Sequence, residues 1–94
     1  MSTDNPTVIH NISANRYEIA IEGHLAVLEY TRREGVIAFV HTGTPEALRG
    51  RGLAAILVKF ALDAARAEGL KVNPLCSYVD AYIKKNPEYA DLVV

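Results

Sequence analysis

The clearest chemical signal in the sequence is a short turn rich in glycine and arginine, which reads Arg49-Gly50-Arg51-Gly52-Leu53-Ala54. It fits the pattern Arg/Gln-x-x-Gly-x-Gly/Ala and lies between an apolar segment and a long helical pattern. The first N–H groups of a helix have no partner within the helix, and they favour an anion. Gly50 and Gly52 let such an anion approach the backbone, while Arg49 and Arg51 add charge-assisted hydrogen bonds. The turn therefore predicts a site for a pyrophosphate.

The bare pattern also has a simpler interpretation. The glycines could serve only to turn the chain from a strand into a helix, with Arg49 and Arg51 as solvated surface charges. The sequence holds neither Gly-x-x-x-x-Gly-Lys-Ser/Thr nor Gly-x-Gly-x-x-Gly with a ribose-binding acid. A P-loop nucleotide hydrolase and a dinucleotide-binding fold are therefore disfavoured.

Two further side chains could carry chemistry. Cys76 follows the last predicted strand, where helix N–H groups lower the pKa of a thiol and make it nucleophilic. The competing interpretation is a buried structural thiol, because free cysteine packs as a small hydrophobe. His41 ends a predicted strand and could accept a proton from an amine or a thiol, although half-buried strand histidines are more often structural. The sequence does not fix the distance between His41 and Cys76.

Alternating apolar residues predict the strands that position these groups. The alternation over residues 17–30 is broken by a Gly-His pair, which predicts a hairpin. A second turn at residues 32–35 leads into the apolar run of residues 36–42, which is typical of a strand covered on both faces. We expect these strands to form an antiparallel meander. Before the hairpin, the residues allow either a short edge strand or a turn.

The apolar period then changes to that of a helix. Apolar residues recur at helical spacing over residues 53–68, and Gly69 supplies the left-handed residue that ends a helix. Residues 70–75 follow as a short strand, which makes a strand-helix-strand crossover with parallel strands. A last helix is predicted to begin near Ser77, capped by its hydroxyl, and to stop before residue 86 because Pro87 follows.

Length and composition restrict the other possibilities. The chain has 94 residues, of which 50% are hydrophobic, and this suits one core and one site. A formal charge of −1 without basic-aromatic clustering disfavours nucleic-acid binding. One cysteine excludes an internal disulfide, and the three histidines lack zinc-motif spacing, so we expect no metal. Residues 1–6 show no secretory signal and no run of about 18 apolar residues occurs, so we expect a cytoplasmic location without membrane contact.

Two longer segments resemble the GNAT acetyltransferase superfamily, and in particular its small Cys/Gly subfamily. They are residues 41–54, HTGTPEALRGRGLA, and residues 74–79, PLCSYV, and the resemblance runs from about residue 17 to residue 93. It implies a minimal GNAT-like α/β fold with a mostly antiparallel sheet, a β-α-β crossover and a C-terminal helix. This fold would form a single domain over residues 1–94 with a partly irregular start. Gly43 and Thr44 depart from the family pattern, which has a larger residue and a β-branched aliphatic there.

The resemblance also implies the ligand, which is acetyl-CoA or coenzyme A held by its pyrophosphate at the turn. It places Cys76 near the acetyl group and adds Thr42, Ser77 and Lys84 to the expected cofactor contacts. Tyr82 resembles a tyrosine on the last GNAT helix that protonates the departing CoA thiolate. Tyr82 could instead pack its ring against the sheet, and Lys84 could simply complement the helix dipole.

Three functions fit these observations. The first is an N-acetyltransferase acting on an unidentified aliphatic amine, which a macromolecule could carry. The transfer would run either through an acetyl-cysteine at Cys76 or by direct attack of the amine. The second is a non-catalytic module that binds or senses acyl-CoA. The third is an interaction domain that has lost the ligand, and the intact turn at residues 49–54 speaks against it. The sequence does not identify the acceptor or the oligomeric state.

Overall fold

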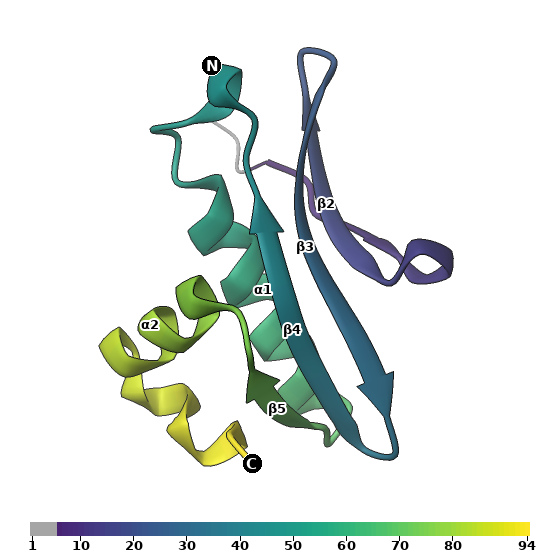
Figure 1. Cartoon of the computed structure of the whole chain (residues 1–94), viewed down its shortest axis with the longest axis vertical. Helices are drawn as coiled ribbons and strands as arrows, with labels where there is room; N and C mark the ends of the chain where they lie inside the picture. Colours follow the sequence, from purple (N-terminus) through teal and green to yellow (C-terminus); the bar gives the residue numbers. More distant parts are fainter. Residues whose placement is uncertain (1–5) are drawn as a thin grey trace.

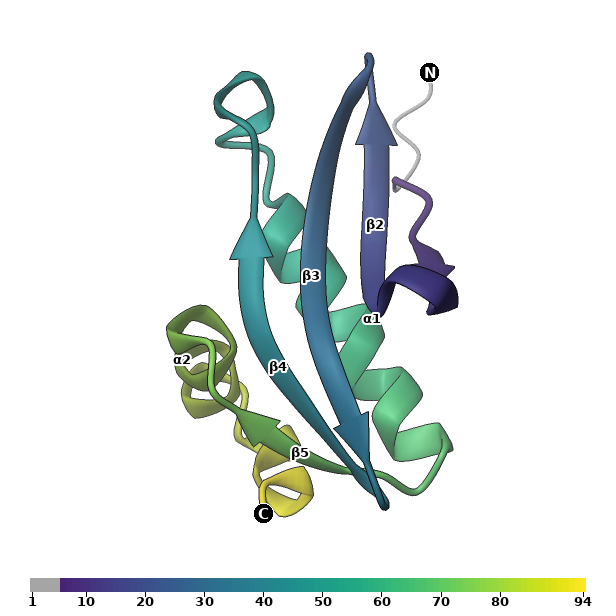
Figure 2. The same cartoon turned by 45° about the vertical axis from the view of Figure 1, so that its right-hand side comes forward.

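The computed structural model describes residues 6–94, and it shows a five-stranded sheet with one long helix packed along one face (Figures 1 and 2). The N-terminal residues 1–5, on which the expectation of no secretory signal mostly rests, lie outside this range. The strands are β1 Ile9–Asn11, β2 Arg16–Ile21, β3 His24–Arg33, β4 Val36–Gly43 and β5 Lys71–Pro74. The helices are α1 Leu53–Ala67 and α2 Ser77–Lys85, with short 3-10 helices η1 Ile12–Ala14, η2 Glu46–Leu48 and η3 Pro87–Leu92.

The strand order in the sheet is the order along the chain, β1-β2-β3-β4-β5. Strands β1 to β4 pair antiparallel, whereas β5 pairs parallel to β4 after the crossover through α1. The predicted meander and crossover are therefore confirmed. The ambiguous start forms both of the expected structures in succession, because the edge strand β1 is followed by the tight turn of η1.

The hydrophobic core lies between the sheet and α1. Strand residues that point to α1 alternate with residues on the opposite face, which we call the open face. The open face holds the directly paired residues Arg16, Glu29 and His41, and further along Thr31, Ala38 and Asn73. The core residues are fully or almost fully buried, and they include Tyr17, Ile19, Ala26, Leu28, Tyr30, Ile37, Phe39, Leu57, Val58, Ala61, Leu62 and Val72.

The expectation that β4 is covered on both faces is wrong. Ile37 and Phe39 are buried toward α1, but Val36 and Ala38 are only half-buried and Val40 is 41% exposed. The apolar run of β4 therefore supplies one core face and one partly exposed face. Sequence periodicity could not show this, because a continuous apolar run looks the same whether or not a second layer covers it.

The ends of the helices differ in how well the sequence predicts them. Helix α1 ends at Ala67, and Gly69 adopts the expected left-handed conformation with a φ of 73°. Helix α2 ends at Lys85 as predicted, but its start differs from the expectation. Cys76 is the N-cap residue and Ser77 is the first helical residue, so no capping bond from the Ser77 hydroxyl forms within residues 6–94.

The C-terminal segment is tied to both α1 and β5. The guanidinium of Arg66 donates to both carboxylate oxygens of Asp91 at 2.9 Å, and the Tyr89 hydroxyl donates to Asp63 at 2.6 Å. The backbone N–H of Val94 donates to the carbonyl of Val72 at 3.0 Å. This segment therefore covers the outer edge of β5. Among residues 6–94, no helix has the length and apolar character that a bilayer span requires.

Candidate functional site

The turn before α1 is built from left-handed glycines. Gly50 has a φ of 84° and Gly52 has a φ of 72°, and Gly52 is the N-cap residue of α1. Other residues adopt such angles only with strain, so the backbone itself requires glycine here. No side chain of the described residues caps the helix, which leaves the first N–H groups of α1 directed out of its end. The predicted anion-binding geometry is present in the backbone.

A hollow of about 210 Å³ opens at this turn. Its size suits a phosphate or diphosphate group rather than a complete nucleotide cofactor, since pockets for whole ligands hold roughly 300–1,000 Å³. Helix α2 contributes to it across the gap from the turn. The lining residues are Thr44, Leu48, Arg49, Gly50, Gly52, Leu53, Ala54 and Tyr78.

The two arginines of the turn are placed differently. Arg49 is exposed and lines the hollow, as the sequence predicts. Arg51 does not line it, because its guanidinium lies 3.4 Å from the carboxylate of Glu22 in the β2–β3 turn. Both side chains of that pair are exposed, so the ion pair is weak and screened by salt. Arg51 can therefore exchange Glu22 for an anion at little cost.

Cys76 lies where β5 leaves the sheet. Its backbone N–H donates to the Phe39 carbonyl at 2.8 Å, and the pairing of β5 with β4 reaches no further than Pro74. The thiol is half-buried, and its sulfur lies 3.9 Å from the hydroxyl oxygen of Thr42. The structure thus brings together two of the predicted site residues, Cys76 and Thr42, between β4 and the start of α2.

His41 lies on the other face of β4. On the α1 face, Tyr30 of β3 pairs with Phe39 of β4. Glu29, the residue before Tyr30, pairs with His41, so Val40 is an extra residue in β4. Such a bulge shifts the alternation by one residue. Thr42 consequently points to the α1 face and His41 to the open face. The structure therefore does not bring His41 and Cys76 together on one side of the sheet.

The side chain of His41 also lies against Gly43, where the sequence departs from the family pattern. A Cβ atom at Gly43 would lie 3.2 Å from Nε2 of His41 and 3.4 Å from a methyl group of Val27. The first of these contacts is tighter than ordinary van der Waals contact. The imidazole of His41 therefore occupies space that the side chain of a larger residue would need.

Tyr82 and Lys85 lie on one side of α2, and Lys84 lies on another. Burial raises the pKa of Tyr82 above its ordinary value, which keeps the phenol protonated but makes it a weaker acid. The centroid of its ring lies 6.3 Å from that of Tyr89 in η3, which is a different neighbour from the sheet that the structural interpretation named. Lys84 pairs with Asp80 at 2.9 Å, whereas Lys85 lines a hollow of about 80 Å³ that Tyr82 also lines. Ser77 is exposed in the first turn of the helix.

Sequence reasoning missed Tyr78, which lines both hollows. A signal for it was present, because Tyr78, Tyr82 and Lys85 are spaced i, i+4 and i+7 and so share one side of a helix. Thr44 was also missed as a lining residue, although it had been noticed as a departure from the family pattern. The described residues hold no cluster of three or more His, Cys, Asp or Glu side chains that could bind a metal ion.

Comparisons with known proteins agree on one family. The family model described as GCN5-related N-acetyl-transferase matches residues 16–92. Protein NATD1 of Mus musculus is 37% identical over 84 residues, which cover 85% of this chain and 76% of NATD1, and Protein NATD1 of Danio rerio is 32% identical over 84 residues. The NMR solution structure of a GCN5-like protein from Staphylococcus aureus superimposes with a TM-score of 0.75 at 25% identity, covering 98% of this chain and 91% of that one. The chain therefore belongs to the GCN5-related N-acetyltransferase family, whose members generally use acetyl-CoA.

Proposed function

We propose that this protein binds acetyl-CoA and transfers its acetyl group to an amine. The observation that carries the proposal is the uncapped N-terminus of α1, which follows two left-handed glycines and opens into a hollow lined by Arg49. Backbone N–H groups, the helix dipole and a guanidinium together fit a pyrophosphate. Leu53 and Ala54 keep the approach free of bulky polar groups.

Acetyl-CoA supplies an acetyl group that is activated as a thioester. The gap between β4 and α2, with Cys76 and Thr42, is the candidate place for that group because it adjoins the hollow through Tyr78. In the covalent route, the thiolate of Cys76 forms a bond to the acetyl carbon as the bond to the CoA sulfur breaks. The amine then attacks the acetyl-cysteine, releases a proton and restores the thiol. In the direct route, Cys76 only lines the pocket.

A second candidate function is a non-catalytic module that binds acyl-CoA. The position of His41 favours it, because the one expected base lies on the open face while the thiol faces Thr42. Such a module would hold the cofactor without turning it over. In the acetyl transfer, whether covalent or direct, Tyr82 would be a weak acid for the departing thiolate, because burial raises its pKa.

Mass spectrometry of the protein incubated with acetyl-CoA tests the proposal. Under native conditions we expect an adduct of the intact cofactor. In the covalent route, a hydroxylamine-labile acetyl group survives denaturation, maps to Cys76 and disappears in Cys76→Ser, while that variant still binds CoA. An adduct seen only under native conditions supports cofactor binding, counts against the acetyl-cysteine, and fits both the direct route and the non-catalytic module. No adduct in either state contradicts the proposal.

A further inference from the structure

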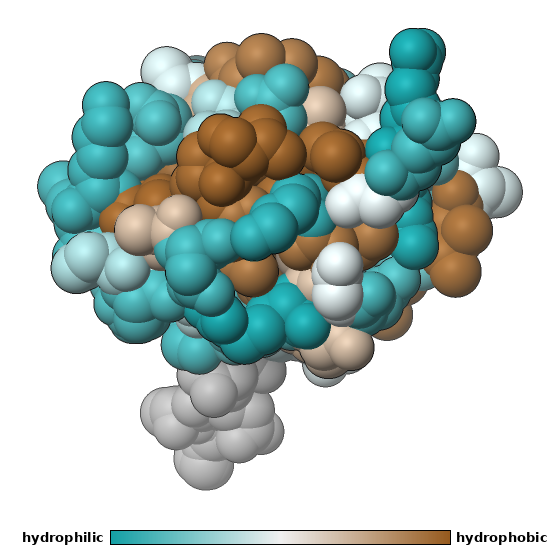
Figure 3. All heavy atoms as spheres, turned by 90° about the horizontal axis from the view of Figure 1, so that it is seen from below, coloured by the Kyte–Doolittle hydropathy of each residue, from teal (hydrophilic) through white to brown (hydrophobic). Residues whose placement is uncertain are grey.

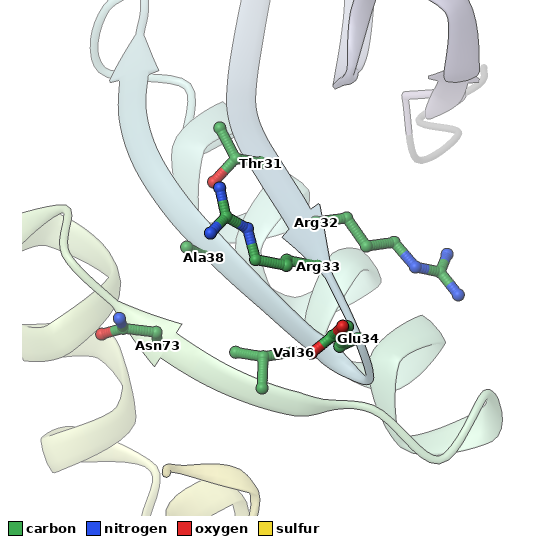
Figure 4. Close-up of a pocket in the computed structure, with 7 residues that line it drawn as sticks. All are labelled: Thr31, Arg32, Arg33, Glu34, Val36, Ala38 and Asn73. Carbon is green, nitrogen blue, oxygen red and sulfur yellow. The ribbon is translucent and has the colours of Figure 1, made fainter.

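The open face of the sheet carries a pocket that the candidate cofactor site does not use. It has a volume of about 500 Å³ and lies between β3, the start of β4, and β5 (Figure 4). Its apolar part comes from Val36 and Ala38, the β4 residues that no second layer covers. Figure 3, seen from the end with the β3–β4 hairpin, shows that hydrophobic surface is exposed among hydrophilic side chains at this end of the molecule. A partly apolar pocket of this volume is in the range of small-ligand sites.

The polar lining of this pocket is cationic and hydrogen-bonding. The guanidinium of Arg33 turns back over the sheet toward Thr31, and Asn73 lines the pocket from β5 (Figure 4). Within residues 6–94, Arg33 makes neither an ion pair nor a side-chain hydrogen bond. Its neighbour Arg32 extends away and pairs with Glu68 at 3.0 Å. Of these two arginines, Arg33 is therefore the one whose charge is available to a ligand.

A carboxylate fits this lining better than a phosphate does. Arg33 offers paired N–H donors and Thr31 offers a hydroxyl, which together match the oxygens of a carboxylate. Glu34 also lines the pocket, and its negative charge opposes a doubly charged phosphate more strongly than a singly charged carboxylate. Val36 and Ala38 would contact an aliphatic group next to the carboxylate.

The pocket is also connected to the candidate acetyl site through β5. Asn73 lies three residues before Cys76, and the Cys76 backbone N–H donates to the carbonyl of Phe39, which directly follows the pocket residue Ala38 in β4. Helix α1 covers the opposite face, which leaves the open face accessible to a second substrate (Figure 2). The pairing of β4 with β5 ends at Phe39 and Pro74, so an acceptor on the open face would reach the Cys76–Thr42 pair where these two strands are no longer joined. We propose that this pocket, the Arg33 pocket, holds the carboxylate of the acetyl acceptor, whose amine extends from there toward Cys76. This assignment rests on the proposed acetyl transfer, and it narrows the acceptor to amines that carry a carboxylate.

The tripeptide Gly-Gly-Leu is a suitable probe, because its amine and carboxylate are three extended residues apart and its leucine can contact the apolar part. Binding of its free acid and of its C-terminal amide would be followed by NMR shifts of Thr31, Ala38 and Asn73. For the wild type, we expect the acid to bind about fivefold or more tightly than the amide, because hydrogen bonds to charged groups are the stronger ones. The preference should vanish in Arg33→Gln and persist in Arg32→Gln.

Equal binding of acid and amide, or an unchanged preference in Arg33→Gln, would overturn the assignment of the pocket. Acetyl transfer to the two peptides is then compared by mass spectrometry, and the acid should be the better acceptor by a similar factor. If acetyl-CoA binds but the acid is not preferred or neither peptide is acetylated, the acceptor assignment is overturned. A failure of acetyl-CoA itself to bind would instead count against the proposed function, whatever the peptides do at Arg33.

Discussion

At the scale of single residues, the phosphate-binding turn was predictable and the side of the sheet occupied by His41 was not. The turn depends on local sequence, since Gly50 and Gly52 adopt left-handed angles and Arg49 is adjacent. The position of His41 depends on a bulge at Val40, which pairing with β3 creates. Strict alternation from the buried Phe39 would have placed His41 on the α1 face. The pairing of Arg51 with Glu22 was equally hidden, because these residues are far apart in the sequence.

Replacing Gly52 by aspartate should abolish most cofactor binding. The new carboxylate would lie at the uncapped end of α1, where it competes with the pyrophosphate for the same N–H groups and repels it. We expect the Kd for CoA, measured by isothermal titration calorimetry, to rise by at least about tenfold. The substitution also forces a left-handed angle on a larger residue, which costs stability of about 1–2 kcal/mol.

Gly35→Asp is the matched control for that backbone cost. Gly35 has a φ of 84°, has open space around it and lies in the β3–β4 hairpin, at the opposite end of the sheet from the turn. It should lower the free energy of unfolding by a similar amount and leave the affinity for CoA unchanged. Comparable losses of affinity in both variants would mean that the turn is not the phosphate site.

At the scale of elements, the types and order were predictable and the contacts between elements were not. The helical spacing of apolar residues predicted α1, and Gly69 predicted where it ends. Pro87 predicted the end of α2. The start of α2 was mispredicted, because the hydroxyl of Ser77 can cap only if Ser77 lies outside the helix, and tertiary contacts of Cys76 with β4 place the cap one residue earlier. The ion pair that attaches η3 to α1 joins residues 25 positions apart and leaves no local pattern.

That ion pair predicts an acid-sensitive contribution to stability. The hydrogen bonds from Arg66 hold the pKa of Asp91 below its ordinary value. A carboxyl whose pKa is lower in the folded state stabilises the fold above its unfolded pKa, near 3.9, and loses this contribution as the pH falls through the folded pKa. Asp91→Asn should therefore be less stable than the wild type at pH 7, and the difference should shrink toward pH 2.

Urea unfolding at the two pH values measures this difference. Asp80→Asn is the control, since Asp80 pairs with Lys84 only within α2 and attaches no second element. We expect it to change stability little, as exposed pairs at this spacing contribute about 0.3–0.5 kcal/mol. An Asp91→Asn penalty that is as large at pH 2 as at pH 7 would contradict an electrostatic role for Asp91.

At the scale of the whole molecule, the candidate site combines residues from before and after the β4–α1–β5 crossover. The turn before α1, the bulged strand β4, and the start of α2 are joined only when the sheet and its helix are folded. A ligand bound there stabilises the folded state and not the unfolded chain. Acetyl-CoA at 100 times its Kd should raise the free energy of unfolding by about 2.7 kcal/mol.

Differential scanning fluorimetry with increasing acetyl-CoA would measure this stabilisation. For a chain of 94 residues, each kcal/mol corresponds to a rise in Tm of about 4–8 °C. Gly52→Asp should show at most about half of this rise at the same acetyl-CoA concentration, because its Kd is at least about tenfold higher. Gly35→Asp should show the full rise from a lower starting Tm. A Tm that does not depend on ligand concentration in the wild type would contradict cofactor binding at this site.

The extra residue in β4 has a consequence in genetic terms. Beyond Phe39, the side of the sheet that a residue of β4 faces is set by its pairing with β3 and not by counting codons, because Val40 has no residue of its own opposite it. An in-frame deletion of the Val40 codon would remove the bulge and, provided that the pairing with β3 is kept, would leave His41 opposite Glu29 and Thr42 opposite Leu28. The sides would be exchanged only if Val40 stayed and the bulge were lost, because Val40 would then pair with Glu29 and every later residue would move to the other face. Loss of one codon here is thus expected to keep the hydroxyl beside the thiol, whereas loss of the bulge would bring the imidazole there.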